Sequence, residues 1–142
     1  MPTTTLFWTW HAIVLAAGLV CVIAGGLLPV YGRHISGWYR YHVLIGGIGG
    51  VLTIIAVALV FDAIYLSGFF SIFLVHVVLG TLLVLTLLAA LGLALLRSRA
   101  EVSRKAALRS AHLWTGRFFM VLMVINILFG LTAMGFLFPC LL

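Results

Sequence analysis

Charged residues are scarce in this sequence. Only 7% of its 142 residues are Asp, Glu, Lys or Arg, and 65% are hydrophobic. Soluble domains carry about 25% charged residues, so the composition excludes an ordinary soluble fold and predicts an integral membrane protein. No stretch alternates polar and apolar residues with a period of two, which excludes the strands of a transmembrane β-barrel.

Cysteine is also nearly absent. The sequence has two cysteines, which are too few for a disulfide framework. It contains no Cys-x-x-Cys-His motif, so covalent attachment of a c-type haem is excluded.

Four long apolar runs fill most of the chain. They cover residues 7–30, 41–64, 69–96 and 111–137, and each exceeds the roughly 20 residues that a spanning helix needs. The runs predict an all-α fold, an up-down four-helix membrane bundle that forms one domain over residues 1–142. The first run lacks a clear cleavage site, so we expect a retained helix rather than a signal peptide.

The basic residues are segregated between the runs. The net charge is +6, and nearly all Lys and Arg residues fall between the first and second runs or between the third and fourth. By the positive-inside rule, these two connections face the cytoplasm and both termini face outside. We expect a location in the cell membrane, contact of the basic connection with anionic lipid, and no nucleic-acid partner. The basic residues in question are Arg33, Arg40, Arg97, Arg99, Arg104, Lys105 and Arg109.

A histidine lies near the start of each apolar run: His11, His42, His76 and His112. An ionisable side chain inside a membrane is costly and usually marks a functional site. Because consecutive helices run antiparallel, His11 and His76 share a depth near the outer face, and His42 and His112 share a depth near the inner face. The sequence therefore predicts two bis-histidine sites, separated by roughly 24 Å at about 1.5 Å per residue.

The number of ligands at each depth favours haem over zinc. A zinc site usually gathers three or four ligands, whereas two neutral imidazoles suit the axial positions of a haem iron. We therefore expect two haem b groups in the bundle core. With both axial positions filled, they would carry electrons rather than bind oxygen.

The spacing His-x-x-x-Gly occurs three times and places Gly46, Gly80 and Gly116 four residues after a histidine. Residues at i and i+4 share a helical face, so a flat macrocycle could lie against the bare backbone. Helix packing through small residues is the alternative explanation. The first helix departs from the pattern, because Leu15 occupies that position.

Other polar residues flank the two predicted sites. The inner site is surrounded by Arg33, Arg40, Lys105 and Arg109, which could pair with haem propionates or could serve topology and lipid contact alone. Arg117 lies within the fourth run, where it either pairs with a propionate or extends to the interface. Asn126 is a candidate contact of the outer haem, with an interhelical hydrogen bond as the simpler role.

Four stretches carry a family resemblance: WHAIVLAAGLVCVIAGGLLPVYGR, WYRYHVLIGGIGG, HVVLGTLLVLTLLAALGLALLR and HLWTGRFFMVLMVINILFGL. Together they resemble a minimal cytochrome b561 domain of the DOMON-linked or ferric-reductase-like kind. The resemblance covers nearly the whole chain. It implies one b haem held by His11 and His76 and a second held by His42 and His112. It also implies electron transfer from a cytoplasmic reductant, often ascorbate, to an outer acceptor.

The chain departs from that family in having four helices rather than five or six, and it lacks the basic ascorbate-contact stretch of eukaryotic members. We therefore expect a di-haem cytochrome that takes electrons from a small-molecule or quinol-type donor. The outer acceptor could be a separate redox protein.

Three alternatives stay open: a quinone-linked haem anchor of a larger dehydrogenase or multihaem complex, a stand-alone ferric-chelate reductase, and a haem-free structural subunit. Short connections leave little material for a substrate pocket, which favours the electron carrier. The sequence leaves electron direction open, and an oligomer is possible.

Overall fold

The computed structural model describes residues 2–67 and 74–133, and the side chains of residues 9–60 and 74–132. These residues form four helices and no strand. The helices are α1 (Pro2–Tyr31), α2 (Trp38–Ser67), α3 (Leu74–Arg99) and α4 (Val102–Ala133). The predicted all-α class and the four-helix membrane bundle are confirmed.

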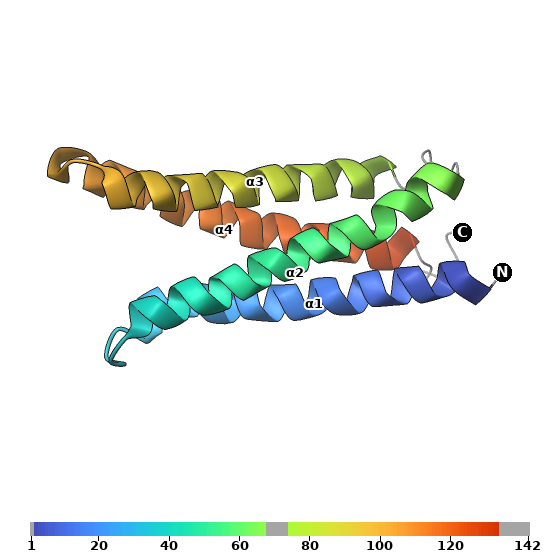
Figure 1. Cartoon of the computed structure of the whole chain (residues 1–142), viewed down its shortest axis with the longest axis horizontal. Coiled ribbons are helices and arrows are strands. Elements are labelled where there is room, and N and C mark those ends of the chain that lie inside the picture. Colours follow the sequence, from blue (N-terminus) through green and yellow to red (C-terminus); the bar gives the residue numbers. More distant parts are fainter. Residues whose placement is uncertain (1, 68–73, 134–142) are drawn as a thin grey trace.

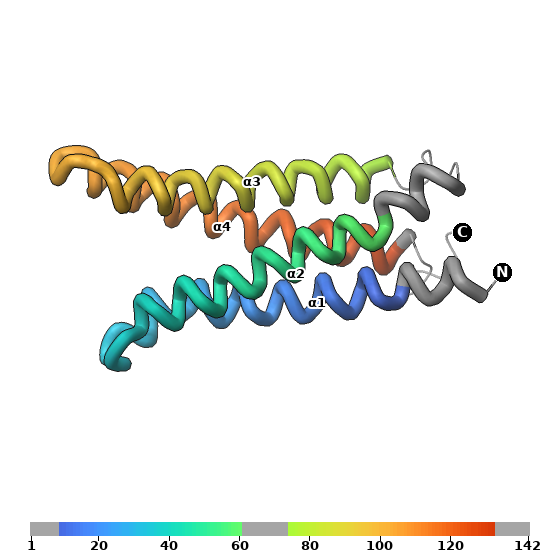
Figure 2. The backbone as a smooth tube through the Cα atoms, viewed as in Figure 1, coloured from blue at the N-terminus to red at the C-terminus, as the bar shows by residue number. Residues whose placement is uncertain are grey.

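The helices form two antiparallel hairpins. α1 packs mainly against α2 and α3 mainly against α4, while α1–α4 and α2–α3 contacts are much sparser. The α1–α2 and α3–α4 connections lie at one end of the molecule, and the first turn of α1 and the last turn of α4 lie at the other (Figure 1). In Figure 2, α2 runs obliquely from beside α1 at the connection end toward the N-terminal end of α3. The two hairpins therefore contact each other less extensively than the two helices within each hairpin do.

All four helices are long and apolar enough to cross a membrane. The spans in the first hairpin, Thr9–Tyr31 and Trp38–Val60, each have 23 residues and a mean hydropathy of 2.6. At about 1.5 Å per residue, such a span is about 35 Å long, slightly more than a bilayer core of about 30 Å. Many large apolar side chains are exposed on the outside of the bundle, as expected where lipid rather than water surrounds the protein.

The helices of the second hairpin extend beyond the apolar runs. α3 continues to Arg99 and α4 begins at Val102, so most of the basic connection predicted from hydropathy is helical. Residues 103–109, Ser-Arg-Lys-Ala-Ala-Leu-Arg, are rich in strong helix formers. They are too polar for hydropathy to include them in the fourth helix. The predicted helix start at residue 69 and helix end at residue 137 lie outside the described residues.

The connection between α1 and α2 is a short loop over residues 32–37. The Gly32 N–H donates to the Leu28 carbonyl at 2.8 Å and closes the end of α1. Gly37 has a φ of 77°, a left-handed conformation that glycine adopts without a steric penalty. α2 then begins at Trp38 and runs back along α1.

The core lies in the middle of the bundle. Leu83 of α3 and Met123 of α4 are fully buried, as is Thr53 of α2, whose hydroxyl donates to the Gly49 carbonyl at 2.9 Å. The apolar core cluster comprises Leu15, Ala56, Leu83, Leu87, Phe119, Leu122 and Met123. It draws residues from all four helices and therefore joins the two hairpins.

Candidate metal centres

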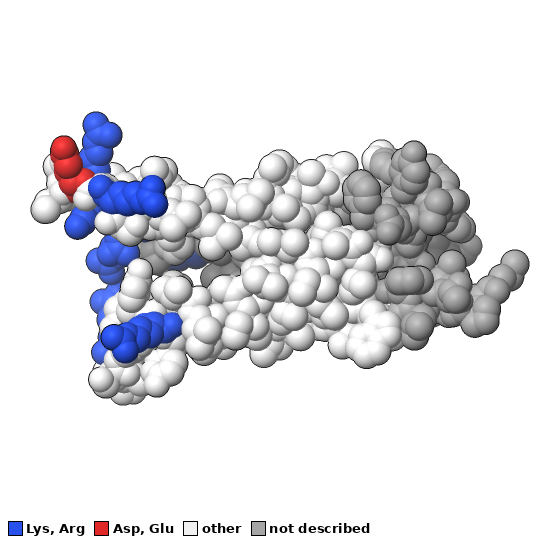
Figure 3. Space-filling model, viewed as in Figure 1, with Lys and Arg blue, Asp and Glu red and all other residues white. Residues whose placement is uncertain are grey.

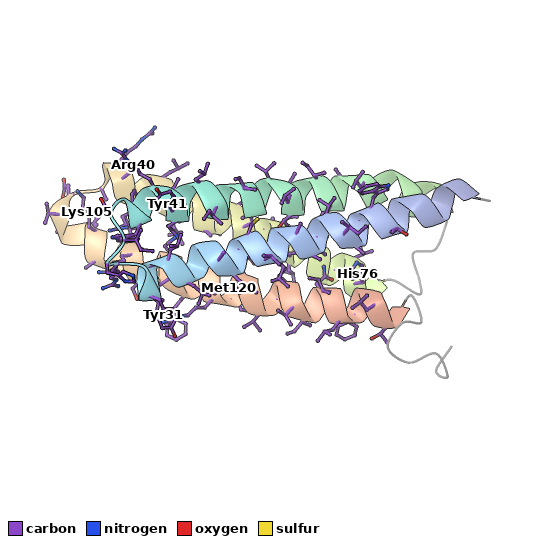
Figure 4. All side chains as sticks on the ribbon, turned by 90° about the horizontal axis from the view of Figure 1, so that it is seen from below. Tyr31, Arg40, Tyr41, His76, Lys105 and Met120 are labelled. Atoms are coloured by element: carbon purple, nitrogen blue, oxygen red, sulfur yellow. The ribbon has the colours of Figure 1, made fainter. Side chains whose placement is uncertain are left out.

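The structure brings His11 of α1 close to His76 of α3. Their ring centroids are 5.9 Å apart and the rings are nearly perpendicular, at 82°. His11 is buried, with 7% of its surface exposed. In Figure 4, His76 lies toward the end away from Arg40 and Lys105. This pair is called the terminal-end site below.

His42 of α2 and His112 of α4 form a second pair. Their ring centroids are 6.3 Å apart, with an angle of 90° between the rings. His42 contacts the Gly25 carbonyl of α1, which lies 14 residues (25 − 11) after His11 and hence about 21 Å farther along that helix. This pair, called the loop-end site below, lies in the half of the bundle near the two connections.

Each of the four imidazoles makes the same kind of hydrogen bond through Nδ1 to a backbone carbonyl of another helix. A carbonyl oxygen can only accept, so Nδ1 must carry the proton. In a neutral imidazole, Nε2 is then unprotonated and available as a metal ligand. The four bonds run from His11 to Ala56 at 2.6 Å, from His42 to Gly25 at 2.7 Å, from His76 to Asn126 at 3.0 Å and from His112 to Ala90 at 3.0 Å.

The spacing of each pair fits a metal ion bound between two rings. A metal–imidazole bond is about 2.0 Å long, and a ring nitrogen lies about 1.1 Å from its ring centre, so two imidazoles on opposite sides of one metal have centroids about 6.2 Å apart. The observed separations are 5.9 and 6.3 Å. Each pair could therefore hold one metal ion between its two imidazoles.

The number of candidate ligands at each point is also informative. Among the residues whose side chains are described, no group of three or more His, Cys, Asp or Glu side chains comes together. A protein-only zinc site needs three or four such ligands. A haem iron needs only two from the protein, because the porphyrin supplies four.

Two of the glycines singled out by sequence spacing face open space. A Cβ atom added to Gly46 or Gly116 would meet nothing within 4 Å. Both lie four residues after a histidine of the loop-end site, and both are partly buried. At the other site, a Cβ on Gly80 would meet the Asn126 amide nitrogen at 3.6 Å. Leu15, at the corresponding position of α1, is buried in the apolar core.

Two further glycines support the histidines, and sequence spacing did not indicate either role. A Cβ on Gly130 would lie 2.9 Å from Cε1 and 3.2 Å from Nδ1 of His76, so only glycine leaves room for that ring. A Cβ on Gly25 would lie 2.9 Å from the Gly46 nitrogen. The resulting close approach of α1 and α2 lets His42 reach the Gly25 carbonyl.

Asn126 acts on the terminal-end site through its backbone as well as its side chain. Its carbonyl accepts the hydrogen bond from His76, and its side chain is 2% exposed. The side-chain oxygen, Oδ1, is buried with no hydrogen-bond partner among the described residues. The amide therefore lies beside the site with an unused acceptor.

The basic residues gather at the connection end of the molecule (Figure 3). Arg33, Arg40 and Arg109 are all exposed. The Arg33 Nε donates to the Pro29 carbonyl at 2.6 Å, so this side chain closes the end of α1. Arg117 is exposed as well, and its guanidinium carbon lies 4.9 Å from the centre of the Trp114 ring. This stacking on an exposed face is typical of an interfacial cation.

Four helices long and apolar enough to span a membrane define a class of protein, a multi-pass membrane protein, and this one has two pairs of imidazoles inside its helix bundle. A family model described as eukaryotic cytochrome b561 matches residues 10–138, and the chain belongs to the cytochrome b561 family. Family membership implies haem b bound through histidines and electron transfer across a membrane. Separate comparisons with curated proteins and with solved structures found no match to this chain.

Proposed function

We propose that this chain is a di-haem b-type cytochrome that conducts electrons between the two faces of a membrane. His11 and His76 would hold one haem b at the terminal-end site. His42 and His112 would hold the other at the loop-end site. Bound there, each group supplies a reversible one-electron couple between ferrous and ferric iron.

The observation that carries the proposal is the shared orientation of four imidazoles. Each donates Nδ1–H to a carbonyl of a neighbouring helix, and each faces a second imidazole about 6 Å away. A histidine retained only for helix packing would need neither a fixed tautomer nor a partner at this spacing. Fixing the tautomer is how proteins orient a metal-ligating histidine.

Other residues of the chain would shape the space around these ligands. Gly46 and Gly116 leave the backbone bare one turn from a ligand at the loop-end site, whereas the Asn126 amide lies close to Gly80 on α3. The fully buried side chains of Leu83 and Met123 would exclude water from the middle of the bundle. Dry surroundings keep electrons from reaching solvent oxidants between the sites.

The polar flanking residues have separate roles. The exposed guanidinium groups of Arg33, Arg40 and Arg109 would draw anionic groups, including propionates, toward the loop-end site. Arg117 would lie at the interface beside Trp114. The buried amide of Asn126 would border the macrocycle at the terminal-end site, where its free oxygen can accept a hydrogen bond.

The donor would act on the basic face and the acceptor on the face that carries the termini. The protein would lie in the cell membrane, with its basic end in the cytoplasm and both termini outside, as the positive-inside rule predicts. A small-molecule or quinol-type donor would lose one electron per transfer and release its proton on its own side. The acceptor, which could be a separate redox protein, would gain that electron.

One apolar groove bears on the quinone-linked alternative. It lies between α1 and α4, and every side chain that lines it is apolar: Leu19, Ile23, Met120, Val121, Val124 and Ile125. A quinone head group needs hydrogen-bond partners for its carbonyls, and this groove supplies none from its side chains. The side chains of this groove therefore offer a quinone head group no hydrogen bond.

Purified protein reconstituted into vesicles tests the proposal. Vesicles loaded with a membrane-impermeant oxidant would receive a membrane-impermeant reductant outside, and internal reduction would be followed optically. We expect reduction with the wild-type chain and none with His11→Ala or His42→Ala, because each variant removes one of the two sites. Equal rates in all three preparations would contradict the proposal.

A further inference from the structure

A proline lies inside α1, four residues after the carbonyl that His42 uses. In an α-helix, the N–H of residue 29 would donate to the carbonyl of residue 25. Residue 29 is Pro29, which has no N–H. The Gly25 carbonyl therefore lacks its helical donor, and the Nδ1–H of His42 donates to it at 2.7 Å.

The other three imidazoles bond carbonyls of a different kind. At each of those, the residue four positions later lies inside the same helix and carries an N–H. The imidazole must therefore share its acceptor with a backbone donor. The acceptors and the residues four positions later are Ala56 and Val60, Ala90 and Ala94, and Asn126 and Gly130.

The surroundings explain how His42 reaches this carbonyl. The backbones of α1 and α2 are so close here that a Cβ on Gly25 would lie 2.9 Å from the Gly46 nitrogen and 3.6 Å from the His42 carbonyl oxygen. No side chain at position 25 stands between the two helices. Gly25 thus permits the approach, and Pro29 leaves the acceptor without a competing donor.

We infer that Pro29 is a positioning residue of the loop-end site, which acts by reserving the Gly25 carbonyl for His42. The inference rests on the proposed function, because it requires His42 to be a haem ligand. An unshared carbonyl accepts the Nδ1–H more strongly, and a strong second hydrogen bond raises the basicity of the ligating nitrogen. A more basic ligand favours the ferric state, so Pro29 lowers the reduction potential of the loop-end site.

The test separates the missing N–H from the proline ring. Pro29→Ala restores an N–H and removes the ring. An ester variant, with the α-hydroxy acid analogue of alanine at position 29, removes the ring but still supplies no N–H. We expect the midpoint potential of the loop-end site to rise in Pro29→Ala and to stay at the wild-type value in the ester. The terminal-end site should be unchanged in both.

A reciprocal variant uses the partner ligand of the same site. The same α-hydroxy acid placed at Ala94 would remove the N–H that competes with His112 for the Ala90 carbonyl. We expect the loop-end potential to fall in this variant. Because it leaves α1 untouched, it also tests the inference if Pro29→Ala does not fold.

Equal shifts in Pro29→Ala and its ester would assign the effect to the proline ring and overturn the inference. So would unchanged potentials in all three variants with both sites loaded. A failure of the proposed function is recognised earlier and differently: His42→Ala would then have the same haem content as the wild-type chain. That result would overturn the proposed function and this inference together.

Discussion

Gly46 and Gly47 offer a matched pair of positions for detecting a macrocycle. They are adjacent in α2, and a Cβ on either would meet nothing within 4 Å. In the polypeptide alone, an alanine at either position costs no contact and improves helix propensity by up to about 1 kcal/mol. They differ in one respect: Gly46 shares the face of His42 and is partly buried, whereas Gly47 is exposed.

A bound haem would make the two substitutions unequal. A methyl group forced against a rigid ring in a packed site costs roughly 1–3 kcal/mol. At about 1.4 kcal/mol per tenfold change, Gly46→Ala should weaken haem binding at the loop-end site about 5- to 150-fold. Gly47→Ala should leave it unchanged, and Gly116→Ala, on the opposing helix, should behave like Gly46→Ala.

The assay is transfer of haem from each purified variant to an excess of a soluble haem acceptor, followed optically. Thermal unfolding of the haem-free chains in detergent provides the control, because both alanine variants should be at least as stable as the wild-type chain. Equal haem-transfer rates for Gly46→Ala and Gly47→Ala would refute the reasoning, since the open space beside Gly46 would then have no occupant.

Three other predictions concern the histidine pairs. His42→Ala should remove the loop-end haem and leave the spectrum of the terminal-end haem intact, and His11→Ala should do the reverse. Loss of the same haem in both variants would show that the histidine pairing is wrong. Gly130→Ala should displace the His76 ring and empty the terminal-end site alone, because a Cβ at position 130 would lie 2.9 Å from the imidazole. A pyridine haemochrome assay should then detect about half the wild-type haem content. A full haem content would show that the His76 ring tolerates a side chain at position 130. Asn126→Leu should retain both haems, since the backbone carbonyl of residue 126 still accepts the hydrogen bond from His76. It should also stabilise the haem-free chain by about 1–3 kcal/mol, because it removes a buried oxygen that has no hydrogen-bond partner. A haem-free variant that unfolds at a lower temperature than the wild-type chain would contradict this expectation.

The proximity of each histidine pair follows from features that a sequence carries. Antiparallel helices and one histidine near the start of each span determine which residues share a depth. The structure brings His11 to within 5.9 Å of His76 and His42 to within 6.3 Å of His112, measured between ring centroids. The fold class can also be predicted from the sequence, because the length of an apolar run is enough to identify a membrane-spanning helix.

The supporting contacts were not accessible from the sequence. Which carbonyl accepts from each imidazole depends on how two helices rotate and approach, so the use of Gly25 and Ala56 needed the structure. Gly130 has no spacing relation to His76, which lies on another helix. For Asn126 the sequence predicts either a haem contact or an interhelical hydrogen bond, but only the structure shows that its backbone carbonyl accepts such a bond from His76. Hydropathy also placed the start of α4 too late, because the first turns of that helix are basic.

Electron paramagnetic resonance of the oxidised wild-type protein, with spin quantitation, tests the central claim most directly. Two haems, each ligated by two nearly perpendicular imidazoles, predict two low-spin ferric signals of high anisotropy that together account for two spins per chain. The observed ring angles of 82° and 90° are the basis of that expectation. A high-spin ferric signal would reveal an open axial position, and a single low-spin signal of one spin per chain would leave one histidine pair without haem; either result would contradict the account.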